Sequence, residues 1–126
     1  MDFSSQRFVD VVVAAPVGQI DHPNAESLRQ ALAPILDATV PTLGALVLDF
    51  SRVSYISSMG LRVLLVAAKQ LRACNARIAI ASLQPNVAEI FGIARFNHVL
   101  EIYPNVRTAL EHVSGPALAA YNAAAT

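Results

Sequence analysis

Short apolar runs alternate with stretches of helical periodicity along most of the chain. Residues 45–50 form an almost uniformly apolar run of strand length, which predicts a strand buried on both faces, and residues 77–82 predict another strand. Between them, apolar residues recur every three or four positions across residues 58–75, which predicts a helix. Three further elements are predicted: a helix over residues 85–94 with Val87, Ile90 and Phe91 facing inward, a strand over 99–103 and a helix over 105–113.

The amino-terminal part of the chain predicts a strand with an interruption. Residues 8–15 are rich in valine, and Pro16 and Gly18 break the run before residues 19–20. This pattern predicts a hairpin or a bulged pair at the edge of a sheet, where proline is tolerated.

A helix is expected to follow this strand. Pro23 suits the first helical turn, and Asp21 or Asn24 can cap it. Pro34 lies within the helical pattern and should end or kink the helix nearby. The apolar face of this helix consists of Ala25, Leu28, Leu32 and Ile35.

The alternation of strands and helices predicts an α/β fold with a small mixed, mainly parallel sheet packed with about four α-helices. With 126 residues the chain is long enough for one domain, with a core at about residues 8–113. Residues 114–126 are rich in alanine and follow Gly115 and Pro116. They either prolong the last helix after a break or fray.

Composition narrows the classes of function. Hydrophobic residues make up 55% of the chain, and nine basic and nine acidic residues cancel, so we expect binding to neither nucleic acid nor a membrane. A helix needs about 18 consecutive apolar residues to span a bilayer, and no segment is that long. The first residues show no secretory signal. The single cysteine, Cys74, favours the reducing cytoplasm. No Cys/His spacing suggests a zinc site, and we expect no cofactor.

The junction at Ser57 and Ser58 is the strongest candidate for chemistry. A strand ends there and a helix begins, and ligands of α/β sheets bind where strands end. Free N–H groups at the helix start favour a phosphate, and Gly60 would let a bulky group approach the backbone closely. The simpler interpretation is a serine that only caps the helix.

An enzymatic interpretation is weaker. Strand, Ser58, one residue, Gly60 and helix resemble the nucleophile elbow of α/β-hydrolases, but Ile56 replaces the first glycine of that motif. His98 and His112 are the candidate bases, in a predicted loop and a predicted helix, and no Ser–His–Asp set is evident. We therefore expect no enzyme.

The helix after Ser58 has two faces. Arg62, Val66, Lys69 and Arg72 share one that is either solvated or a docking surface. The core stripe on the other consists of Leu61, Leu64, Leu65, Ala68 and Leu71.

The block Tyr-Ile-Ser-Ser-Met-Gly-Leu-Arg-Val-Leu at residues 55–64, with Gly-Gln-Ile-Asp at 18–21 and Leu-Asp-Phe-Ser at 48–51, resembles the STAS domain. The closer resemblance is to the bacterial anti-sigma-factor antagonists, over about residues 8–113. It implies binding to an anti-sigma factor that is also a serine kinase, switched off by phosphorylation of Ser58 and reset by a Ser/Thr phosphatase. Asp21 corresponds to the family's acidic residue near this junction.

The sequence departs from the family at two positions. Many members have aspartate at the position of Ser57 and serine or threonine at that of Met59. Ser57 is therefore an alternative acceptor, and an acceptor in the place of Met59 could not be phosphorylated here. Two other interpretations remain: an unphosphorylated ligand- or nucleotide-sensing or scaffold domain, stressosome-like or transporter-associated, and a small serine hydrolase. The expected partner surface consists of Asp21, His22, Asn24, Ser57, Met59, Gly60, Arg62, Val66 and Lys69.

Overall fold

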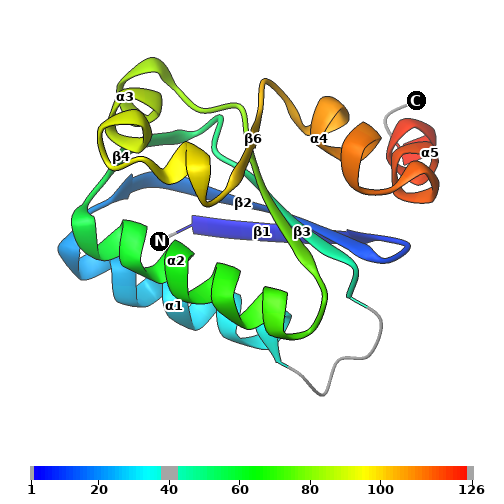
Figure 1. Ribbon diagram of the computed structural model, residues 1–126, viewed down its shortest axis with the longest axis horizontal. Coiled ribbons are helices and arrows are strands. Elements are labelled where there is room, and N and C mark those ends of the chain that lie inside the picture. Colours follow the sequence, from blue (N-terminus) through cyan, green and yellow to red (C-terminus); the bar gives the residue numbers. More distant parts are fainter. Residues whose placement is uncertain (1, 38–42, 125–126) are drawn as a thin grey trace.

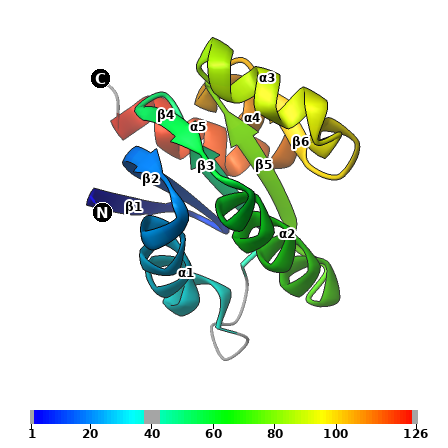
Figure 2. The same ribbon diagram turned by 90° about the vertical axis from the view of Figure 1, so that its left-hand side faces the viewer.

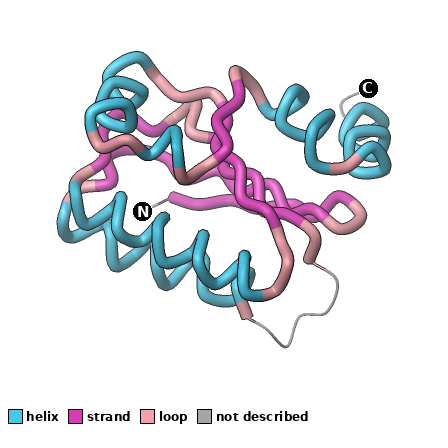
Figure 3. The backbone as a smooth tube through the Cα atoms, viewed as in Figure 1, coloured by secondary structure: helices cyan, strands magenta, loops and turns pink. Residues whose placement is uncertain are grey.

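The computed structural model describes residues 2–37 and 43–124, and it places a six-stranded sheet between layers of helices (Figures 1 and 3). The strands are β1 (Asp2–Phe8), β2 (Val11–Ile20), β3 (Ala45–Asp49), β4 (Val53–Ile56), β5 (Arg77–Ala81) and β6 (Glu101–Tyr103). The helices are α1 (His22–Leu36), α2 (Ser58–Ala73), α3 (Pro85–Ile93), α4 (Val106–Val113) and α5 (Gly115–Ala124), with a 3₁₀ turn at Phe96–His98. The predicted mixed, mainly parallel sheet is confirmed, and five α-helices lie in the described ranges rather than about four.

The sheet has the strand order β1-β2-β3-β5-β6, and β4 pairs with β2. Among the strand pairs of the described residues, only the β1–β2 hairpin is antiparallel. Strand β2 is long enough to pair with two parallel strands in succession: its first half lies against β3 and its last three residues lie against β4. This arrangement brings the carboxyl ends of β2 and β4 together.

Of the two predicted alternatives, the hairpin at Pro16 is wrong, because β2 runs through Pro16 without a break, and Phe8 belongs to β1. Pro16 lies after the residues that pair with β3 and before those that pair with β4, so its missing N–H costs no bond to a parallel partner. The predicted bulge is present at Gly18, where the register with β4 shifts and φ is +102°. At this end of the strand order the edge strand is β1 rather than β2.

Side chains of the central strands divide between two hydrophobic cores. In β5, Ile78 and Ile80 pack in the core beneath α1 and α2, whereas Ala79 and Ala81 pack in the core beneath α4 and α5. The two helix layers lie on opposite faces of the sheet (Figures 1 and 2). Small residues on the α4–α5 face let those helices approach the sheet closely.

Within the alanine-rich tail, α5 (Gly115–Ala124) resumes the helical course after a break at Ser114, one of the two predicted alternatives, and residues 125–126 lie outside the described residues. Ser114 lies between α4 and α5, where its hydroxyl accepts a hydrogen bond from the Ala117 N–H (3.2 Å) and donates one to Asp10 Oδ1 (3.0 Å). The rings of Phe8 and Tyr121 meet edge to face, 5.5 Å apart, and hold α5 against β1.

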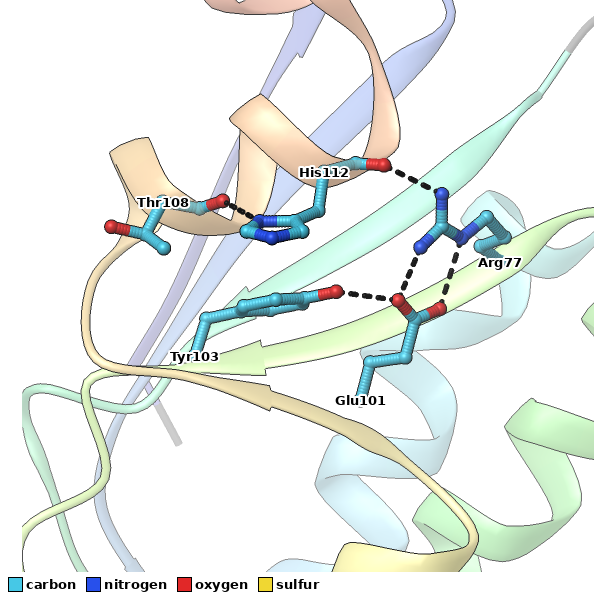
Figure 4. A network of polar contacts seen from close by, with 5 residues as sticks. All are labelled: Arg77, Glu101, Tyr103, Thr108 and His112. Carbon is cyan, nitrogen blue, oxygen red and sulfur yellow. Dashed lines mark hydrogen bonds and ion pairs between the residues drawn. The ribbon is translucent and has the colours of Figure 1, made fainter.

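A polar network ties β5 and β6 to α4 (Figure 4). Arg77 binds both carboxylate oxygens of Glu101 and also donates to the His112 carbonyl (2.7 Å). The Tyr103 hydroxyl donates to Glu101 (2.6 Å), and the Tyr103 ring stacks on His112 with centroids 4.8 Å apart. The bond from Arg77 holds the pKa of Glu101 below its usual range, against the opposing effect of partial burial.

We expect this network to make stability depend on acid pH. Because the pKa of Glu101 is lowered by folding, its charge stabilises the fold above its ordinary pKa of 4.5, and that contribution is lost as pH falls through the lower folded value. Glu101→Gln should therefore reduce the free energy of unfolding near neutral pH, by about 1 kcal/mol or less for a partly exposed pair. The deficit should vanish in acid.

Urea denaturation of both proteins across the pH range measures this difference. Glu89→Gln, at an exposed position of α3, is the control for the loss of one negative charge. A Glu101→Gln deficit that persists unchanged in acid would contradict the role of the ion pair.

Candidate functional site

Two helices begin side by side at one edge of the sheet. Strands β2 and β4 pair in parallel with Ile20 opposite Ile56, and each leads directly into a helix. The Ser57 N–H donates to the Ile20 carbonyl (2.8 Å), which ties the two junctions together. The positive ends of both helix dipoles therefore lie close together, as Figure 2 shows for α1 and α2.

Asp21 caps α1. Its Oδ1 accepts from the Asn24 N–H at 3.0 Å, and the Asn24 side-chain amide donates to the Gln19 carbonyl at 2.8 Å. The two residues thus fix the start of α1 next to the serines. His22, the first residue of this helix, is exposed beside them.

At the start of α2, Ser57 and Ser58 have different roles. Ser57 is the cap: its extended backbone precedes the helix, and its Oγ accepts from the Gly60 N–H at 3.2 Å. Of the two serines, the cap is therefore Ser57 and not Ser58. Ser58 is the first helical residue, it is exposed, and no hydrogen bond of its side chain occurs among the described residues. Its hydroxyl is free for chemistry.

Gly60 serves packing rather than access. It is buried, and a Cβ built at this position would lie 2.7 Å from Ile20 Cγ2 and 2.7 Å from Ile56 Cγ1. The expectation that Gly60 lets a partner approach is therefore wrong, because two isoleucines of the sheet already fill the space. Its missing side chain lets the first turn of α2 sit directly on β2 and β4.

A groove of about 580 Å³ runs between α1 and α2 and begins beside the serines. It includes three of the predicted surface residues of α2, namely Met59, Arg62 and Val66, together with His22 of α1. Further apolar walls are Ala25, Leu32, Ala33, Leu36, Val63 and Ala67, and further polar positions are Glu26, Arg29, Asp37 and Gln70.

The residues of the predicted docking face of α2 do not all lie in the groove. Arg62 and Val66 line the groove, whereas Lys69 does not. Arg72 donates to the Val99 carbonyl at 2.6 Å, on the side of the helix that faces the segment before β6. Of the α1 wall only His22 was predicted, because the sequence does not show which helices are neighbours.

The sequence also gave no sign of Tyr55. This residue lies in β4, three positions before Ser58, and 41% of its surface is exposed. Helix α3 approaches β4, since the Asn86 amide donates to the Ser54 carbonyl, and the Gln84 amide just before α3 donates to the Ser51 carbonyl (2.9 Å). Tyr55 is thus an exposed aromatic ring on the strand that leads to Ser58.

The structure offers no support for a hydrolase. His112 donates from Nδ1 to the Thr108 carbonyl and stacks on the Tyr103 ring, and no histidine of the described segments hydrogen-bonds to Ser57 or Ser58. In residues 2–37 and 43–124, no three His, Cys, Asp or Glu side chains gather to hold a metal ion. No helix in these segments is long and apolar enough to cross a membrane.

Comparison with known proteins places this fold in a family. The STAS domain model matches residues 3–109. Because that match covers most of the sequence, the chain belongs to the STAS domain family, as the motif around Ser57 and Ser58 indicated.

Two similar proteins are named as candidate anti-sigma factor antagonists. A Bordetella bronchiseptica protein named as a candidate anti-sigma factor antagonist, BtrV, is 36% identical over 104 residues, 82% of this chain and 84% of that protein. A candidate anti-sigma factor antagonist from Thermotoga maritima has a TM-score of 0.80 at 21% identity, covering 88% of this chain and 93% of that one.

The anti-sigma factor antagonist SpoIIAA has the same fold. Its unphosphorylated form has a TM-score of 0.70 at 19% identity, over 90% of this chain and 99% of that one. The phosphorylated form of the Bacillus protein has a TM-score of 0.67 at 18% identity, over 90% and 100%. At these identities the structural likeness establishes the fold alone.

The two serines should differ in their effect on stability. Ser57→Ala removes the cap of α2 and should lower the free energy of unfolding by about 1 kcal/mol, within a range of roughly 0.5–2. Ser58→Ala removes an exposed hydroxyl and should change it by less than about 0.5 kcal/mol. Urea denaturation of the two matched variants measures both values, and a Ser58→Ala loss as large as that of Ser57→Ala would contradict the assigned cap.

Gly60→Ala should destabilise the domain because its methyl group would overlap Ile20 and Ile56. We expect a loss of about 1–3 kcal/mol, typical of overpacking. Gly92→Ala is the matched control: it also lies in a helix, and a Cβ there meets nothing within 4 Å. The control should be neutral or gain up to about 1 kcal/mol from helix propensity. Equal effects of the two substitutions in thermal or urea unfolding would exclude the packing role of Gly60.

Proposed function

We propose that this protein is an anti-sigma-factor antagonist that acts by binding rather than by catalysis. It binds an anti-sigma factor with serine kinase activity in the cytoplasm, which releases the sigma factor. The kinase transfers the γ-phosphoryl group of ATP to Ser58 Oγ, giving ADP and releasing the hydroxyl proton, and the complex then dissociates. A Ser/Thr phosphatase removes the phosphate and restores binding.

The observation that carries this proposal is the different placement of the two adjacent serines. Ser57 is engaged as the cap, whereas Ser58 is exposed at the first position of α2. A kinase must reach the hydroxyl that it modifies, so Ser58 is the better acceptor. The names of BtrV and SpoIIAA support the class of function, and the phosphorylated SpoIIAA supports the type of modification.

A phosphate at this position suits a switch. It adds a charge of about −1.5 to −2 at pH 7, and a helix start accommodates that charge without disturbing the fold. A partner surface that fits the neutral serine would have to accommodate the new charge and displace the water bound to it, which weakens binding. The partner surface that we assign surrounds Ser58 and consists of Asp21, His22, Asn24, Tyr55, Met59, Arg62 and Val66.

Incubation with ATP and each candidate anti-sigma-factor kinase of the host should add a single phosphate to the protein. Intact mass should show one addition, and peptide mapping should place it on Ser58, because that hydroxyl is exposed and uncommitted. Ser58→Ala should accept no phosphate. Ser57→Ala, the matched control, should still be modified.

Phosphate on Ser57 in the wild-type protein would move the acceptor and contradict the assignment of Ser58. Absence of both phosphorylation and binding with every such kinase would contradict the proposed function as a whole.

A further inference from the structure

The groove between α1 and α2 carries apolar surface that the fold itself does not use. Met59 is 39% exposed and Val66 is 46% exposed, and both line the groove two turns apart on α2. Leu32 at its floor is fully buried, so the groove reaches the hydrophobic core. Along α2 it extends from Met59 to Gln70, which corresponds to about three helical turns.

The charges of the groove are unequal. On α1, Glu26 and Arg29 neutralise one another, with Arg29 Nε 2.9 Å from Glu26 Oε2. On α2, Arg62 lines the groove without an ion pair or hydrogen bond to any residue in the described parts of the chain. Both helix dipoles also have their positive ends at this end of the groove. Asp21 already supplies a carboxylate at the start of α1, so Arg62 on α2 is the groove cation at this end that favours an anionic group.

Ser58 and Arg62 are four residues apart in α2, so they are neighbours on its surface. Side chains at this spacing have Cβ atoms about 5–6 Å apart, and an acidic residue placed one turn before a basic one is the favourable orientation. A phosphate on Ser58 is therefore within reach of Arg62. The guanidinium cannot pair fully with this phosphate and with a partner's carboxylate at once.

We propose that the groove receives an amphipathic helical segment of the anti-sigma factor, with an acidic residue of that segment paired to Arg62. Phosphate on Ser58 then displaces the segment, because Arg62 pairs with the phosphate instead of with the acidic residue of the segment. This inference rests on the proposed function and specifies its partner surface and its switch. Dissociation follows from competition for one cation as well as from repulsion.

The shape of the groove favours a helix as its occupant. Its walls are two packed helices, and a third helix can place its side-chain ridge between them. The groove offers no strand edge to which an extended peptide could add. The apolar positions would receive one face of the segment, and the positive end would receive its carboxylate.

Binding of the isolated kinase to four variants tests the groove. Arg62→Gln should weaken binding about tenfold, the loss of one favourable ion pair. Its matched control, Arg107→Gln, removes the same charge from an exposed position of α4, on the opposite face of the sheet. Val66→Glu should weaken binding tenfold or more, whereas Ile93→Glu makes the same change at an apolar position that is 78% exposed on α3. Circular dichroism and thermal unfolding confirm that each variant is folded.

The outcomes separate the groove from the wider function. Loss of affinity in Arg62→Gln and Val66→Glu alone supports the groove. Wild-type affinity in both, together with normal phosphorylation of Ser58, would overturn the groove and leave the proposed function standing. Failure of the wild-type protein to bind any anti-sigma factor would overturn both. Self-association in the wild-type protein that Val66→Glu abolishes, without an effect on kinase binding, would assign the groove to a second copy of the chain.

Phosphorus NMR tests the competition for Arg62 without a partner. Protein carrying phosphoserine at position 58 is titrated through the second ionisation of the phosphate, which lies near pH 6. Pairing with Arg62 should lower this apparent pKa relative to Arg62→Gln, and Arg107→Gln should match the wild type. Equal values in the wild type and Arg62→Gln would overturn the proposed competition, whatever the binding data show.

Discussion

The first turn of α2 packs directly against β2 and β4, and the position of the site depends on this contact. Gly60 has no side chain, so the helix backbone lies against Ile20 and Ile56. Ser57 adds two hydrogen bonds to this contact: its N–H donates to the Ile20 carbonyl, and its hydroxyl accepts from the Gly60 N–H. With one side of the turn fixed in this way, the next residue, Ser58, faces outward. A chemical change at Ser58 therefore alters the surface and leaves the fold intact.

The same packing determines what surrounds Ser58. Pairing of β2 with β4 places the start of α1 next to the start of α2, so two helix dipoles and the capping residues Asp21 and Ser57 meet at one edge. The α1–α2 groove begins at that edge, and Arg62 lies one turn from Ser58 within it. A single phosphate on Ser58 would then interact both with the positive helix starts and with Arg62. The partner contact and its regulation then share the same few residues.

The sequence predicted the buried elements well because their signals are local. The strand near residues 45–50 and the helix from Ser58 were evident from apolar periodicity alone. Strand β1 was missed because it is a polar, mostly exposed edge strand whose side chains hardly alternate in burial. The strand that ends at Ser57 was not recognised as a separate strand, β4, because it has only four residues between a turn and a helix.

The site was predicted in part for the same reason. The Ser57–Gly60 motif indicated the junction, but two adjacent serines are equally good caps in sequence, and only the backbone geometry assigns that role to Ser57. The roles of Gly60 and of the α1 wall depend on contacts between distant segments, which no local pattern contains. The Arg77–Glu101 pair, 24 residues apart, was beyond sequence reasoning for this reason too.

The most direct test of the account compares the affinity of two forms of the protein for its anti-sigma factor. One form carries phosphoserine at position 58 and the other an unmodified serine, and calorimetry under identical conditions gives both dissociation constants. We expect phosphate to weaken binding by roughly 5- to 150-fold, a coupling of about 1–3 kcal/mol, while the circular dichroism spectrum stays the same. Equal affinity of the two folded forms would contradict it.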